Sequence, residues 1–185
     1  MWNDFKRESI ESTPARDVKT LVDSGAWVLV DVRLPSNYEE AHAADAVSIP
    51  AFVEMKMGQN MSGVGDFLKA AALLSNGVTP VKKNDDFMVD AKKASENGKK
   101  GLIFYCEAGG TLKPSMNFMY GKQSRSLQAM HEAMKAGLKV GHLDGGIYSW
   151  YQEGLPMVGE YDEKNVGRTP NAALAATYHT EDKEF

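Results

Sequence analysis

The stretch Gly101-Leu102-Ile103-Phe104-Tyr105-Cys106 decides the fold class of this 185-residue chain. Residues 101–105 form a short, unbroken apolar and aromatic run, which predicts a strand buried on both faces of a parallel sheet. Cys106 ends this strand, and the segment 107–111 (Glu-Ala-Gly-Gly-Thr) has neither strand nor helix character. Because open α/β sheets hold their sites at the carboxyl ends of strands, Cys106 is a candidate site residue.

Segments with strand and helix character alternate along the rest of the chain. Such alternation predicts a parallel sheet with right-handed crossovers. Ser12-Thr13-Pro14 is typical of a helix start, and Ser124-Arg125-Ser126 opens another segment with helical periodicity. We expect the remaining strands at 27–30, 46–49 and 139–143, further helices at 36–41, 65–74, 84–96 and 147–151, and the end of the globular part at Gly154-Leu155-Pro156.

The composition excludes several classes of protein. A net charge of −4 argues against a nucleic-acid-binding protein, which usually has a basic face. The single cysteine excludes an internal disulfide and argues against a cysteine-based zinc site. The chain contains no apolar run long enough to span a membrane, and its start lacks signal-peptide character, so we expect a cytosolic protein or a mature form without its targeting segment.

The order of four motifs resembles the rhodanese-like family, the single-domain sulfurtransferases. The resemblance covers roughly residues 8–158 and implies an α/β fold with a central five-stranded parallel sheet and helices on both faces. The motifs are Asp31-Val32-Arg33, the segment 38–50 (YEEAHAADAVSIP), Cys106 before an arginine-bearing helix, and the segment 143–156 (LDGGIYSWYQEGLP).

The resemblance also implies the domain limits. A rhodanese-like domain is expected over 1–158, and a largely extended C-terminal extension over 159–185. The family's loop reads Cys-x-x-Gly-x-Arg-Ser, whereas Arg125-Ser126 arrives late here, so that 110–123 is expected to be an insertion. This long loop is similar to that of plant and algal plastid members, which predicts a chloroplast location, in the stroma or associated with thylakoids; the alternative is the cytoplasm.

The resemblance to sulfurtransferases implies that Cys106 carries sulfane sulfur as a persulfide. The donor would be a small sulfur-containing anion such as thiosulfate, and neither a cofactor nor a metal is expected. Substrate-binding roles are expected for Arg125, Gly109, Gly110 and Ser126. Glu107 opposes this chemistry, because a carboxylate beside a thiol raises the pKa of the thiol.

Three further residues are expected to support the site structurally. Asp31 and Arg33 end a strand, where an ion pair between them would order the neighbouring loops. His42 is expected to be a hydrogen-bonded structural residue, although His42 and His142 each also have an alternative interpretation as a proton donor.

Two functions remain open at this level. The first is a sulfurtransferase that uses Cys106. The second is a catalytically weak or inactive binding module that docks on a plastid protein, or a thylakoid complex, through 110–123 and the 159–185 extension. The insertion supports the second hypothesis, because it contains four apolar residues, and apolar clusters on a surface usually mark a contact site: Met116, Phe118, Met119 and Tyr120.

Overall fold

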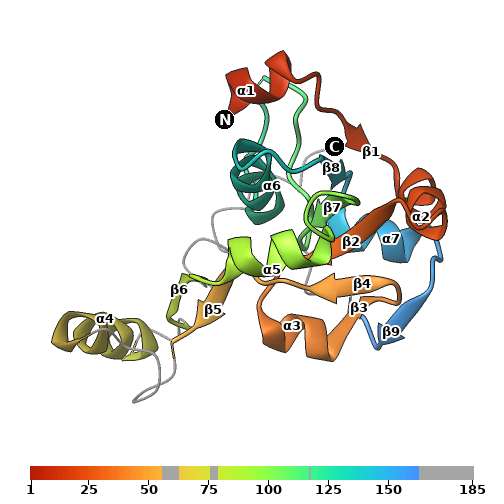
Figure 1. Cartoon of the computed structure of the whole chain (residues 1–185). Helices are drawn as coiled ribbons and strands as arrows, with labels where there is room; N and C mark the ends of the chain where they lie inside the picture. The colour runs from red at the N-terminus through yellow and green to blue at the C-terminus, as the bar shows by residue number, and fades with distance from the viewer. Residues whose placement is uncertain (56–62, 76–78, 117, 163–185) are drawn as a thin grey trace.

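The computed structural model of the chain describes residues 1–55, 63–75, 79–116 and 118–162. Its centre is a five-stranded sheet in the order β1-β8-β7-β2-β4, in which every neighbouring pair is parallel (Figure 1). The expected α/β fold is thus confirmed. The strands are β1 (Ser12–Thr13), β2 (Trp27–Asp31), β4 (Ala46–Ser48), β7 (Gly101–Tyr105) and β8 (Val140–Leu143).

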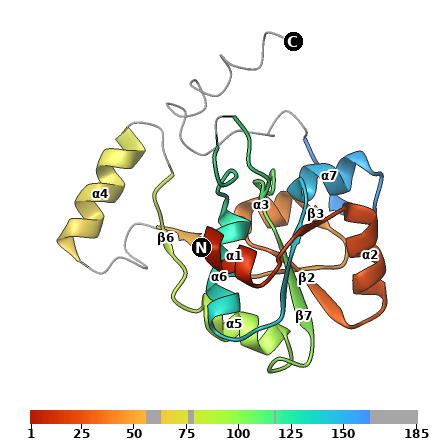
Figure 2. The same ribbon diagram turned by 90° about the horizontal axis from the view of Figure 1, so that it is seen from above.

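Helices cover both faces of this sheet. Helices α2 (Ala15–Asp23) and α7 (Gly146–Gln152) lie on one side, and α5 (Phe87–Ala94) and α6 (Arg125–Lys135) lie on the other (Figure 2). Successive side chains of a strand point to opposite faces, so each face has its own apolar core. Leu29 and Ile103 pack with α2 and α7, whereas Val30 and Phe104 pack with α5 and α6.

Smaller elements surround the sheet. Strand β3 (Ala41–Ala43) pairs antiparallel with β9 (Met157–Gly159), and β5 (Phe52–Glu54) pairs antiparallel with β6 (Val81–Lys83). The remaining helices are α1 (Trp2–Arg7), α3 (Pro35–Glu40) and α4 (Val64–Ser75). Helix α4 projects away from the sheet in Figures 1 and 2.

Two sequence-based expectations about element ends are wrong. The helix expected after Ser12-Thr13-Pro14 is present as α2, from Ala15, but Ser12 and Thr13 form edge strand β1 instead of capping it, because a two-residue strand is too short to show any periodicity. The fold also continues past Pro156, since β9 pairs with β3 and crosses the expected boundary at 158. The expected extension from residue 163 onward lies outside the described residues.

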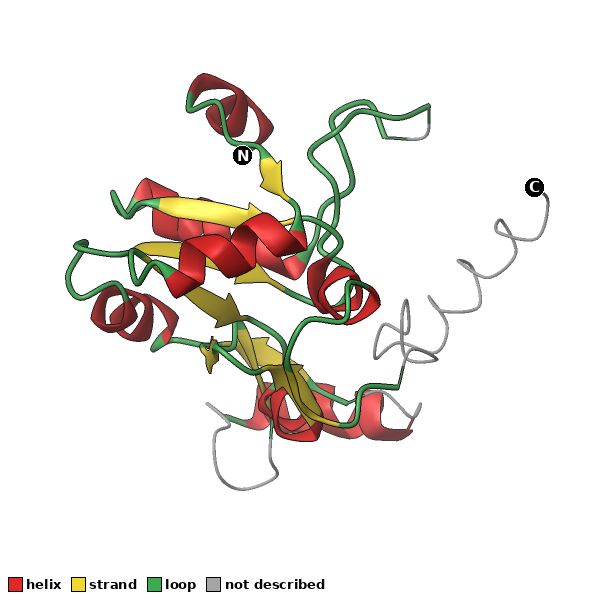
Figure 3. Ribbon diagram, turned by 90° about the vertical axis from the view of Figure 1, so that its right-hand side faces the viewer, coloured by secondary structure: helices red, strands yellow, loops and turns green. Residues whose placement is uncertain are grey.

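The expected insertion forms a long loop that stands away from the sheet (Figure 3). An antiparallel bridge between Thr111 and Lys122 joins its two ends. Its four apolar residues are exposed, with Met116 at 101% and Met119 at 73% relative exposure. They therefore do not close over Cys106.

No helix in the described part of the chain is long and apolar enough to cross a membrane.

Candidate active site

Cys106 lies immediately after β7, at the carboxyl edge of the sheet, and is only 7% exposed. The loop that follows bends sharply, because Gly109 and Gly110 both have left-handed backbone angles (φ +73° and +71°). A Cβ atom on Gly109 would lie 2.7 Å from the backbone nitrogen of Gly146. The glycines therefore allow the cysteine loop to pack directly against the start of α7.

The start of α6 closes the loop from the other side. Ser124 caps the helix, since its hydroxyl oxygen accepts from the N–H of Leu127 at 3.2 Å. The same hydroxyl donates to the Gly109 carbonyl at 2.7 Å. Ser126, which is fully buried, places its Oγ 3.3 Å from the Sγ of Cys106. The structure thus brings together four of the expected site residues: Cys106, Gly109, Gly110 and Ser126.

Arg125 begins α6, one residue before Ser126, and its side chain is half-buried. It makes no hydrogen bond or ion pair with any residue that the structure describes. A guanidinium at this position leaves all its donors available for an anion. Lys113 and Lys122 lie in the projecting loop, where both are exposed.

His142 and Ser12 extend the site away from Cys106. The sequence pointed to His142 only as an alternative proton donor, and it gave Ser12 no role in the site. Nε2 of His142 lies 3.1 Å from the Ser126 hydroxyl, and Nδ1 lies 2.8 Å from the hydroxyl of Ser12. Burial lowers the pKa of His142 to about 4, so its ring is neutral at pH 7. Only the tertiary structure places β1 beside β8, and the sequence carried no signal for this contact.

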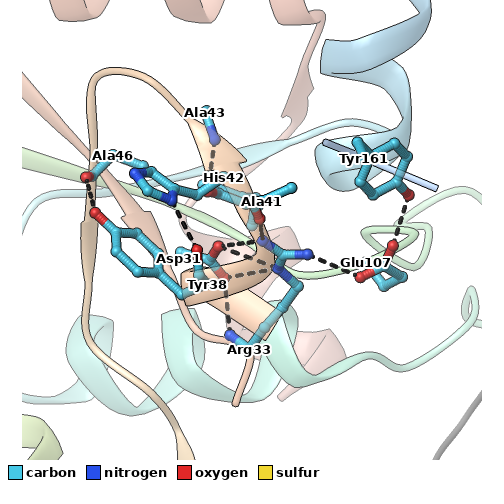
Figure 4. A network of polar contacts seen from close by, with 10 residues as sticks. Asp31, Arg33, Tyr38, Ala41, His42, Ala43, Ala46, Glu107 and Tyr161 are labelled. Carbon is cyan, nitrogen blue, oxygen red and sulfur yellow. Dashed lines mark hydrogen bonds and ion pairs between the residues drawn. The ribbon is translucent and has the colours of Figure 1, made fainter. Parts of the chain in front are cut away.

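Arg33 is the hub of a second polar network, which holds the loops near Cys106 (Figure 4). Its guanidinium donates to both carboxylate oxygens of Asp31 at 2.8–3.1 Å, and to the Ala41 carbonyl of β3. Burial disfavours the charge of Arg33, but the hydrogen bonds and charge of Asp31 more than offset this effect, so the pKa of Arg33 lies above its usual value.

Glu107 belongs to this network instead of facing the thiol freely. One carboxylate oxygen accepts from Arg33 at 3.1 Å, and the other accepts from the hydroxyl of Tyr161 at 2.5 Å (Figure 4). Burial, followed by the hydrogen bond to Glu107, raises the pKa of Tyr161. The sequence prediction for Glu107 considered only its neighbour in the chain and missed both partners.

His42 lies in β3, at the edge of the same network. Its Nδ1 is 2.7 Å from the Tyr38 carbonyl oxygen, and its ring stacks on the Tyr38 ring at a centroid distance of 3.8 Å. The Tyr38 hydroxyl in turn donates to the Ala46 carbonyl. These contacts connect α3 to β3 and β4.

Within the described ranges, no three His, Cys, Asp or Glu side chains gather as metal ligands.

Comparison with known proteins identifies similar chains. Residues 14–153 match the model of the rhodanese-like domain. Over 149 residues the chain is 29% identical to "Rhodanese-like domain-containing protein 14, chloroplastic" of Arabidopsis thaliana, covering 80% of this chain and 65% of that protein. The chain therefore spans less than two thirds of that relative's length.

Solved structures show more distant similarity. A rhodanese-like domain from Anabaena sp is 19% identical, with a TM-score of 0.49 over 86% of this chain and 83% of that chain. Thiosulfate sulfurtransferase from Pseudomonas aeruginosa is 15% identical, with a TM-score of 0.49 over 94% of this chain and 26% of that chain.

Proposed function

This chain belongs to the rhodanese-like domain family, and from that membership we propose that it is a sulfurtransferase that carries sulfane sulfur as a persulfide on Cys106. The observation that carries the proposal is the position of the thiol. Cys106 directly follows the central strand β7, at the start of a tight glycine turn, with the Ser126 hydroxyl 3.3 Å from its sulfur.

The reaction needs the thiolate of Cys106 as the nucleophile. The thiolate attacks the outer sulfur of a donor such as thiosulfate, the S–S bond of the donor breaks, and sulfite leaves with the electron pair. A thiophilic acceptor then attacks the outer sulfur of the persulfide, and the thiolate is released. No net oxidation occurs, and no cofactor is needed.

Three groups suit the anions in this cycle. The Ser126 hydroxyl lies within donating distance of the sulfur. The first backbone N–H groups of α6 favour negative charge near the loop. Arg125 lies at the same helix start, its guanidinium has no partner among the described residues, and we assign it to the anionic donor. The role that we assign to Gly109 and Gly110 is to shape the turn that follows Cys106.

Transfer of sulfur from thiosulfate to cyanide tests the proposal. Wild-type protein should form thiocyanate, and Cys106→Ser should form none while its circular dichroism spectrum stays unchanged. Arg125→Ala should raise the KM for thiosulfate, because it removes the charge assigned to the anion; Lys113→Ala is the matched control in the projecting loop. Thiocyanate formation by Cys106→Ser at the wild-type rate would refute the proposal.

A second candidate function is a catalytically weak or inactive binding module. The exposed loop favours it, since Met116, Phe118, Met119 and Tyr120 have exposed fractions of 40–101%. Such a module would dock on a plastid protein through 110–123, and through 159–185.

Replacement of residues 112–121 by Gly-Gly tests the docking role. Thr111 and Lys122 are antiparallel bridge partners, so a two-residue turn can close the shortened loop. Docking predicts an unchanged rate of Cys106 alkylation and loss of a co-purifying partner. Faster alkylation would show that the loop shields Cys106, and retention of the partner would contradict the docking role.

We also propose a chloroplast location, in the stroma or associated with thylakoids. The Arabidopsis relative is described as chloroplastic, and this is the support for the proposal. Immunodetection in isolated chloroplast fractions from the source organism tests it. Recovery of the protein in the cytoplasmic fraction alone would contradict it.

A further inference from the structure

A continuous row of polar side chains connects the edge strand β1 to Cys106. It runs from the Ser12 hydroxyl to Nδ1 of His142 (2.8 Å), from Nε2 of His142 to the Ser126 hydroxyl (3.1 Å), and from there to the Cys106 sulfur (3.3 Å). Strands β1, β8 and β7 lie side by side, and Ser12 pairs with His142, which pairs with Phe104. The row therefore follows one face of the sheet.

The interior of this row is closed to water. His142 and Ser126 are both 0% exposed. Each buried polar atom must therefore find its partner within the protein, and the number of protons limits the arrangements that satisfy all contacts. The neutral ring of His142 carries one proton, so one ring nitrogen donates and the other accepts.

An anionic sulfur fixes the direction of every bond in the row. The thiolate sulfur of Cys106 only accepts, so Ser126 must use its single O–H to donate to it. Nε2 of His142 must then donate to the Ser126 oxygen, because two acceptors would otherwise face each other. Nδ1 is consequently bare, and it accepts from the hydroxyl of Ser12.

The Gly109 carbonyl does not need Ser126 as its donor, so the Ser126 hydroxyl can turn toward the sulfur. Gly109 accepts from Ser126 at 3.2 Å, but it also accepts from Ser124 at the shorter distance of 2.7 Å. When Ser126 turns toward the sulfur, the Gly109 carbonyl keeps the Ser124 donor. The reorientation therefore leaves no buried carbonyl without a partner.

We infer that Ser12 and His142 are positioning residues, which orient the Ser126 hydroxyl so that it donates to the sulfur of Cys106. The inference rests on the proposed role of Cys106 as the sulfur carrier. Ser12 supplies the donor that the bare Nδ1 accepts from in this arrangement. A hydrogen bond at Nδ1 polarises the ring and strengthens the donation from Nε2 to Ser126, so loss of Ser12 weakens the whole row.

Three charged residues lie close in sequence to members of the row: Glu107, Arg125 and Asp144. Glu107, next to the thiol, is held by Arg33 and Tyr161. Arg125 begins α6, and Asp144 follows β8. The charge of Asp144 raises the pKa of His142, but burial lowers this pKa by more. Neither Ser12 nor its neighbour Thr13 on β1 adds a charge.

The pH dependence of Cys106 alkylation by iodoacetamide tests this assignment without requiring sulfur transfer. The midpoint of the rate profile should rise by about half a pH unit or more in Ser12→Ala, as expected when a thiolate loses a hydrogen-bond donor. Ser12→Thr keeps the hydroxyl and should restore the wild-type midpoint. Thr13→Ala, the neighbour on the same strand, should leave the midpoint unchanged.

A double variant tests whether Ser12 acts through Ser126. In the Ser126→Ala background, Ser12→Ala should cause no further shift. An unchanged midpoint in Ser12→Ala alone, or an equal shift in both backgrounds, would overturn the inference.

Nitrogen-15 NMR of the wild-type protein reads the tautomer directly and needs no variant. Above the midpoint of alkylation, His142 should show a protonated Nε2 and a bare Nδ1, and the opposite assignment would overturn the inference. Mass spectrometry after thiosulfate treatment reports separately on sulfur loading. Absence of loading together with the expected midpoint shift would refute the proposed function and leave the positioning row in place.

Discussion

At the scale of single residues, Arg33 connects the parts of the molecule that surround Cys106. It binds Asp31 at the end of β2, the Ala41 carbonyl in β3 and Glu107 in the cysteine loop. Arg33 and Asp31 are 4% and 1% exposed, so neither charge has water as an alternative partner. We therefore expect the pair to support the structure around Cys106 rather than to contact a substrate.

Arg33→Ala should destabilise the protein strongly. It leaves the Asp31 carboxylate buried without its cation, which costs about 3–5 kcal/mol of unfolding free energy and lowers the Tm on the order of 10 °C. Thermal unfolding followed by circular dichroism measures the change. Arg16→Ala, which removes an exposed ion pair with Glu153, is the control and should barely change the Tm. An unchanged Tm with lost sulfur transfer would instead place Arg33 in the reaction.

His142 should make stability depend on pH. Burial lowers its pKa from 6.5 to about 4, so the unfolded chain binds a proton in this interval and the folded chain does not. The contribution is complete above pH 6.5 and is lost as pH falls toward 4, by roughly 3 kcal/mol in total. Urea unfolding at several pH values measures it. His142→Asn should show a shallower dependence between pH 4 and 6.5, and an identical slope in both proteins would contradict the assignment.

Individual residues also show where reasoning from the sequence reaches its limit. The sequence pointed to Cys106, Gly109, Gly110 and Ser126, which the structure does bring together, because their spacing follows one turn and one helix start. It missed Ser12, which contacts His142 across 130 positions of the chain. Such a contact depends on strand order, which no local pattern encodes.

At the scale of elements, strand β9 extends the fold beyond the last expected helix. It pairs Gly159 with Ala41, Val158 with His42 and Met157 with Ala43. Tyr161, two residues after this strand, reaches Glu107 beside the thiol. The pairing of β9 with β3 thus helps hold the cysteine loop. The three residues of β9 are too few to give a strand signal, whereas the unbroken apolar run of β7 gave a clear one.

Gly159→Ala should disrupt this pairing more than a matched glycine substitution does. Gly159 and Gly154 both have left-handed backbone angles (φ +81° and +66°), so that alanine is strained at either position. At Gly159 the added Cβ would also lie 2.1 Å from the Glu40 carbonyl oxygen, whereas at Gly154 it meets nothing within 4 Å.

The clash should cost about 1–3 kcal/mol beyond the strain shared with Gly154→Ala. Denaturant unfolding of the two variants measures the difference. Equal loss of stability in both variants would show that the contact of Gly159 with Glu40 does not constrain β9.

At the scale of the whole molecule, the sheet places Cys106 between two packed faces. The five strands bring Cys106 to the carboxyl edge, α6 supplies Ser126 from one side, and the start of α7 meets the cysteine loop from the other. Alternation of strand and helix patterns predicted a parallel sheet with helical crossovers, and the resemblance to the rhodanese-like family implied its five strands and the helices on both faces. Edge strand β1 and the pair β3–β9 could not be predicted, because strands of two or three residues are stabilised by their neighbours rather than by their own sequence.

The mass of the intact protein after incubation with thiosulfate tests the central claim most directly. Wild-type protein should gain the mass of one sulfur atom, and a thiol reductant should remove it, because a persulfide is reducible. Cys106→Ser should gain nothing under the same conditions. A wild-type protein that gains no sulfur, or a Cys106→Ser variant that gains as much as wild type, would contradict the account.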